Sequence, residues 1–106
     1  MAKYLWEGSY SAEGAKGLAK EGGSSRKETM TKLVKKLGGK IEAFYFAFGQ
    51  ADFFVIVDLP DSASAAALSL AVAQAGAVRM KTHVLLTPDE LDEASKKSVG
   101  YRAPGQ

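Results

Sequence analysis

The chain has 106 residues, of which 46% are hydrophobic and 25% charged, and its formal net charge at pH 7 is +2. This length and balance predict one soluble globular domain, and so small a charge argues against binding of nucleic acid or of an anionic membrane surface. The sequence has no cysteine and one histidine, which excludes disulfides and thiolate chemistry and argues against a metal site.

The N-terminal third predicts one strand and one regular helix. Aromatic and apolar residues indicate a strand over Lys3–Ser9. Each glycine within residues 11–23 costs a helix interior about 1 kcal/mol, so we expect a loose or broken helix there. Ser25 and Glu28 have the spacing of a capping box, which predicts that the regular helix spans Arg26–Leu37.

The rest of the chain predicts three strands and two helices. We expect strands over residues 40–48, 52–59 and 77–86, a helix over residues 63–75, and a short helix from Pro88 to about Lys97. Asp61 or Ser62 caps the longer helix, while Thr87 and Glu90 form a capping box for the shorter one. The tail, from about residue 98 to residue 106, is expected to be extended.

This order of elements is β-α-β-β-α-β with an additional C-terminal helix. It predicts a ferredoxin-like α+β fold over residues 1–106, in which a four-stranded antiparallel sheet carries the helices on one face. The fourth strand is expected beside the first, followed by the third and then the second.

Alternation along the strands predicts which side chains share a face of the sheet. One set contains Tyr45, Phe53, Val55 and Val57 and is expected to pack against the helices. The opposite set contains Leu5, Phe44, Phe46, Phe48, Phe54 and Ile56 among charged residues. Because soluble monomers rarely expose an apolar patch of this size, we expect two copies to associate face to face, as a homodimer or within a higher homo-oligomer.

The single histidine, His83, is expected on the second set's face, close to Glu7 of the neighbouring strand. The candidate catalytic residues are His83, Glu7 and Asp52, because a histidine beside a carboxylate can act as a general base. The candidate ligand-binding residues are Phe46, Phe54, Arg79, Lys81 and His83. Two structural alternatives stay open: His83 could be hydrogen-bonded to a partner subunit, and Asp52 could accept backbone N–H bonds at the hairpin.

Several stretches of the chain resemble the GYD-domain family. They are KYLWEGSY, EGAKGLAKEGGSSRKE, LGGKIEAFYFAFGQADFFVIVDLPD, GAVRMKTHVLLTPDEL and GYRAPG, so the resemblance covers about residues 3–104. The most specific part is the turn in which Gly49 and Asp52 match the family, while Ala51 stands in place of the family's tyrosine. The resemblance implies a dimeric α+β barrel. The wider superfamily includes cofactor-free monooxygenases, haem-degrading or haem-using enzymes, small isomerases and ligand-sensing proteins, and a shared fold does not select among them.

These observations lead to two functional hypotheses. In the first, a homo-oligomer binds a small apolar or aromatic metabolite in a cavity between two sheets, without a cofactor. In the alternative, the protein is a monooxygenase-like enzyme, either cofactor-free or haem-dependent, with His83 as base or ligand. The first residues lack the apolar region of a signal peptide, and no apolar run approaches the roughly 20 residues that cross a bilayer, so we expect a cytoplasmic protein.

Overall fold

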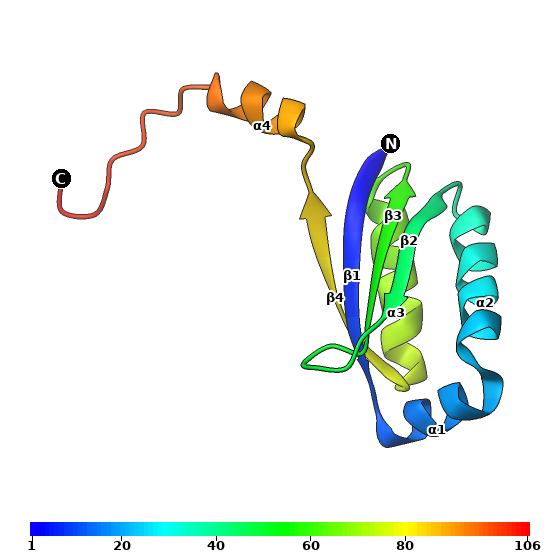
Figure 1. The fold of residues 1–106 in the computed structure, drawn as a ribbon. Helices are drawn as coiled ribbons and strands as arrows, with labels where there is room; N and C mark the ends of the chain where they lie inside the picture. The colour runs from blue at the N-terminus through cyan, green and yellow to red at the C-terminus, as the bar shows by residue number, and fades with distance from the viewer.

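A four-stranded antiparallel sheet with helices on one face forms the body of the computed structural model, which describes residues 1–106 (Figure 1). The strands are β1 (Ala2–Tyr10), β2 (Lys40–Phe46), β3 (Phe53–Leu59) and β4 (Val78–Leu85), and the helices are α1 (Ala12–Glu21), α2 (Gly23–Lys36), α3 (Ser62–Ala75) and α4 (Pro88–Ser95). The strand order β2-β3-β1-β4 confirms the predicted ferredoxin-like α+β arrangement. No helix is long and apolar enough to cross a membrane.

The core lies between the sheet and the two long helices, α2 and α3. Trp6, Val34, Val55, Val57 and Leu59 are the largest fully buried side chains. Burial of each such side chain is worth about 1.5–3 kcal/mol, so this layer supplies much of the stability of the fold. The opposite face of the sheet is covered by no helix, as Figure 1 shows.

The segment after β1 differs from the prediction, because α1 is a regular helix rather than a broken one. The Ser11 hydroxyl accepts a hydrogen bond from the Gly14 N–H and caps the helix. At Gly14 a Cβ would collide with the backbone carbonyl of Ala77 and approach the Tyr10 ring. The glycine therefore allows α1 to lie against the end of the sheet, and this packing offsets its low helix propensity.

The start of α2 was also predicted wrongly. The helix begins at Gly23, and Gly22 reverses the chain between α1 and α2 with a φ of 91°. The Ser25 hydroxyl donates to the Glu21 carboxylate instead of forming a cap with Glu28. The later start signals hold: the Asp61 carboxylate accepts from the Ser64 N–H and caps α3, which keeps the pKa of Asp61 below its ordinary value.

A β-bulge in β2 corrects the predicted faces of the sheet. Ile41 pairs with Val57, but Ala43 already pairs with Ile56, so one extra residue is inserted between them. Because side chains alternate with a period of two, an inserted residue moves every later side chain to the other face.

Phe44 and Phe46 therefore lie on the helix side, and Tyr45 lies on the uncovered side with 71% of its surface exposed. Phe44 stacks on Phe53 of the core, with ring centroids 6.5 Å apart. The sequence prediction had placed these three side chains of β2 on the opposite faces. The strand also ends at Phe46, so Phe48 lies in the β2–β3 loop and is fully exposed.

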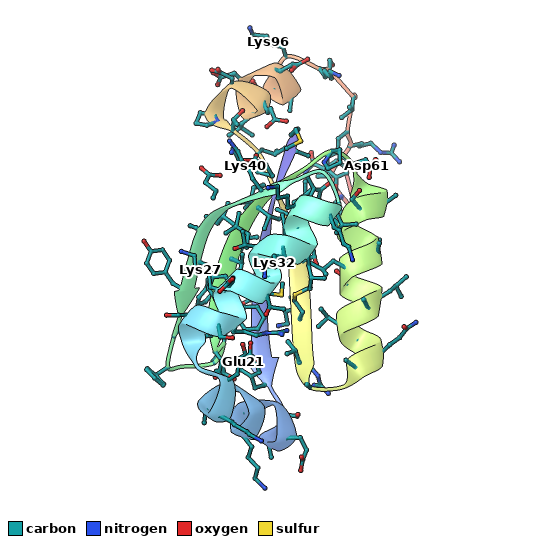
Figure 2. The ribbon with its side chains drawn as sticks, turned by 90° about the vertical axis from the view of Figure 1, so that its right-hand side faces the viewer. Glu21, Lys27, Lys32, Lys40, Asp61 and Lys96 are labelled. Carbon is teal, nitrogen blue, oxygen red and sulfur yellow. The ribbon has the colours of Figure 1, made fainter.

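The C-terminal part of the chain stands clear of the body. Thr87 and Glu90 form the predicted capping box at the start of α4, but no residue of α4 is buried. In Figure 1 the helix and the segment after it extend away from the sheet, on the side that the other helices leave uncovered. The view in Figure 2 agrees, since α2 there faces the viewer and α4 lies above the body.

Candidate functional site

The uncovered side of the sheet, called here the open face, brings His83 and Glu7 together. His83 Nε2 lies 2.9 Å from Glu7 Oε1, and their side chains are 47% and 28% exposed. The two residues meet because β1 and β4 pair so that Leu5 lies opposite His83 and Glu7 opposite Lys81. This is the arrangement of a base with an orienting carboxylate, although the catalytic roles of both residues stay predictions.

Side chains of the open face form rows across the sheet. The rows are Tyr45–Phe54–Glu7–Lys81, Ala43–Ile56–Leu5–His83 and Lys40–Asp58–Lys3–Leu85. In the last row the Lys3 ammonium is bonded to both Glu42 and Asp58, at 2.8 and 2.9 Å, and these carboxylates raise the pKa of Lys3. The open face is therefore a short apolar centre between charged groups.

Arg79 and Lys81 line a small hollow at the lower end of the open face, called here the polar hollow. Its volume is about 140 Å³, and it is lined by Glu7, Gly8, Ser9, Gln50, Ala51, Arg79 and Lys81. This space is smaller than the roughly 300–1,000 Å³ typical of small-molecule sites, and its lining is almost entirely polar. His83 is not among the residues that line the polar hollow, and its role as a haem ligand stays a prediction.

Two predicted site residues, Asp52 and Phe46, lie elsewhere. The Asp52 carboxylate accepts the Tyr10 N–H at 2.8 Å, while the Asp52 N–H donates to the Gly8 carbonyl at 2.7 Å. These bonds tie the β2–β3 loop to β1. Asp52 is thus a backbone acceptor, as the structural alternative held, but its bond crosses to β1 instead of capping its own hairpin.

Asp52 and Phe46 line a second space, called here the α1 hollow, between α1 and the β2–β3 loop. Its volume is about 450 Å³, and it is lined by Tyr10, Ala15, Leu18, Ala19, Gly23, Phe46, Ala47, Phe48 and Asp52. Apart from Gly23 and Asp52 the lining is hydrophobic, with three aromatic rings. Size and lining both match those of ordinary ligand sites.

The Asp52 carboxylate is the charged group of the α1 hollow. Its Oδ2 accepts from Tyr10, and the other oxygen, Oδ1, has no hydrogen-bond partner within the chain. No cation lies within ion-pairing distance of it. The carboxylate is half-buried and lines this largely apolar space, where a hydrogen bond is strong.

Tyr10 joins the α1 hollow to two neighbouring spaces. It also lines a hollow of about 660 Å³ between α3 and β4, and a narrow apolar crevice with Arg26 at its wall. Burial raises the pKa of the Tyr10 phenol, Arg26 lowers it, and Asp52 and Glu21 raise it further. The neutral phenol is therefore the stable form, and it can donate or accept a hydrogen bond.

The sequence prediction missed Tyr10 and Arg26, although signals for both were present. Tyr10 continues the alternation of Tyr4 and Trp6 along β1, and Arg26 precedes Met30 by four residues on the buried stripe of α2. Arginine is seldom buried without a polar partner, so its place in such a stripe predicts a polar contact at the edge of the core.

Comparison with known proteins assigns the chain to a family. No group of three side chains that could hold a metal ion is present. No curated protein matches the chain, and no solved structure does. Residues 4–95 match the family model of the GYD domain, which agrees with the fold and with the predicted resemblance, and the chain therefore belongs to the GYD domain family.

Proposed function

We propose that this protein is a homodimeric small-molecule-binding protein that holds an aromatic ligand in the α1 hollow. The supporting observation is the union of an apolar space of about 450 Å³ with one half-buried carboxylate that has a free oxygen. A cavity between two sheets, expected from the sequence, concerns the assembled dimer and stays a prediction.

The lining defines the chemistry of the ligand. Phe46, Phe48 and Tyr10 offer ring surfaces for an aromatic body. A carboxylate accepts hydrogen bonds, so the ligand is expected to carry a donor such as a hydroxyl or an ammonium group. A carboxylate at the same place would be repelled by Asp52 and by Glu21, which lies near Tyr10.

Three probes of one size test this proposal: 1-naphthylmethanol, 1-naphthylmethylamine and 1-naphthoate. Binding is followed by shifts of the backbone amides of Gly23, Ala47 and Asp52 in NMR spectra. The alcohol and the amine are expected to bind, and the acid to bind at least about tenfold more weakly, the equivalent of 1.4 kcal/mol. If none of the three probes moves these amides, the proposal fails.

A filling variant locates the bound probe. Ala19→Trp is expected to occupy the α1 hollow and abolish binding, because Ala19 is exposed and lines that space. Ala67→Trp is the matched control, since Ala67 is an exposed small residue on α3 away from the hollow. Equal binding by both variants would place the ligand somewhere else.

The homodimer is proposed to form through the open face. Leu5 and Ile56 lie half-buried at its centre, flanked by the partly exposed rings of Tyr45 and Phe54. A second copy would cover these four side chains by a two-fold, self-complementary contact. Light scattering after gel filtration at micromolar concentration tests this, and a stable monomer would contradict it.

A second function is favoured by the contact between His83 and Glu7. In this alternative His83 acts as the base of a cofactor-free monooxygenase-like enzyme, and Glu7 orients the imidazole. His83→Ala would then abolish turnover of a hydroquinone by dioxygen and leave the dimer intact, while Glu7→Gln would retain partial activity. Absence of turnover by the unmodified protein across a panel of hydroquinones counts against this function.

A further inference from the structure

The residues after β4 have no partner within their own chain. They comprise α4 and the following segment to the C-terminus, residues 88–106, called here the arm. More than half of the surface of each large apolar residue is in solvent: Leu91 is 60% exposed, Val99 84% and Tyr101 77%. A capped helix with an apolar residue and no core of its own is poorly stable alone, which points to a surface that covers it.

The arm lies on the same side of the sheet as the open face. Figure 1 shows α4 leaving the upper end of β4 toward the side without helices. The β2–β3 loop bounds the opposite, lower end of the open face, because Gln50 and Ala51 line the polar hollow together with Arg79 and Lys81. The arm and this loop thus mark the two ends of the open face.

The charges at the two ends are complementary. α4 has no cation and carries four carboxylates, those of Asp89, Glu90, Asp92 and Glu93. None of them is in an ion pair. At the other end Arg79 and Lys81 are exposed cations without an ion-pair partner, since the neighbouring Glu7 carboxylate is bonded to His83. The partly exposed ring of Phe54 lies in the same row of the open face as Lys81.

In the structure the two ends lie far apart within one chain. Arg79 and Leu85 are six residues apart on β4, which corresponds to about 20 Å of strand, and the arm begins beyond Leu85. Two open faces related by a two-fold axis across the strands would place the upper end of one chain over the lower end of the other. Each arm would then meet the partner's polar hollow, twice per dimer.

We infer that the arm of each chain docks on the lower end of the open face of a second copy, with the carboxylates of α4 on Arg79 and Lys81. Leu91 and Tyr101 supply apolar contact with the ring of Phe54, which shares a row of the open face with Lys81. Lys96, Lys97 and Arg102 follow α4 and lie outside this acidic contact. The inference rests on the proposed homodimer and adds the residues that fix its orientation.

Cysteine cross-linking tests the docking directly, because the chain has no cysteine of its own. The double variant Lys81→Cys/Glu93→Cys is expected to form covalent dimers on mild oxidation, seen on non-reducing gels. The matched control is Lys27→Cys/Glu93→Cys, since Lys27 is an exposed lysine of α2, on the helix side. Each single variant controls for contacts between two identical positions.

Charge reversal gives an independent test. Arg79→Glu/Lys81→Glu is expected to weaken the dimer at least about tenfold, and adding Asp92→Lys/Glu93→Lys is expected to restore it. A Lys81→Cys/Glu93→Cys variant that is dimeric by light scattering but gives no more covalent dimer than the Lys27 control overturns the docking and leaves the dimer standing. A protein that is monomeric by light scattering overturns both.

Discussion

Replacement of Asp52 separates its structural role from its proposed ligand role. The carboxylate accepts the Tyr10 N–H at 2.8 Å, and Tyr10 is half-buried at the junction of three hollows. A hydrogen bond to a charged group contributes about 1.5–3 kcal/mol, so Asp52→Ala is expected to destabilise the fold by about that amount. Asp52→Asn retains an oxygen acceptor without the charge and should cost about half as much.

Chemical denaturation at one fixed protein concentration measures both changes, since a dimer's stability depends on concentration. For a domain of this size 1 kcal/mol lowers Tm by about 4–8 °C, so the alanine variant should melt at least 6 °C lower. Lys27→Ala on the exposed side of α2 is the control and should stay within about 0.5 kcal/mol of the unmodified protein. If Asp52→Ala is as stable as this control, the bond to Tyr10 does not secure the loop, and a purely ligand-directed carboxylate would explain the position better.

Three further perturbations test the packing, the pKa of Tyr10 and the independence of α4. Gly8→Ala places a Cβ inside the space of the buried Phe53 ring, so the free energy of unfolding should fall by about 1–3 kcal/mol, and a Gly8→Ala/Phe53→Leu variant should recover part of the loss. Because burial raises the pKa of Tyr10 above its ordinary value of 10.0, its share of stability is complete below that pH and is lost as pH rises through the folded-state pKa. In a titration followed by tyrosinate absorbance, Tyr10→Phe should lose the component with the highest pKa. Arg26→Met should move that component to a higher pH, because Arg26 lowers the pKa of Tyr10. An unchanged titration curve in both variants would contradict this. Thr87→Ala removes the capping box, worth about 1 kcal/mol. At concentrations low enough for the chain to be monomeric, it should speed amide exchange in α4 about fivefold while global unfolding is unchanged, and a lower Tm there would show that α4 packs on the body of its own chain.

Elements with strong local signals could be predicted from the sequence. The aromatic and β-branched runs gave the four strands, and the caps at Asp61 and Thr87 gave the starts of α3 and α4. The capping box at Ser25 was misleading, because Gly22 turns the chain earlier and α2 begins at Gly23. Local sequence rules do not decide between these two start signals, because the first residue of α2 depends on how α1 packs at the end of the sheet.

The candidate site was harder to predict, for a specific physical reason. The bulge between Ile41 and Ala43 leaves no mark in the hydrophobic pattern, yet it transfers Phe44 and Phe46 to the other face. Asp52 follows a loop, where alternation no longer holds, so its bond to Tyr10 could not be found from spacing. The contact between Glu7 and His83 could be predicted, because β1 and β4 are regular and their register is unbroken.

The same bulge divides the functions proposed for the two sides of the sheet. Without the extra residue, Phe46 would lie on the open face, and the α1 hollow would lose one of its aromatic walls. The open face would then be more apolar than the mixed rows it carries, in which Glu7, Lys81 and His83 alternate with Leu5 and Phe54. A mixed surface of this kind favours an association whose orientation depends on charge, and this is the property that the arm and the polar hollow would use.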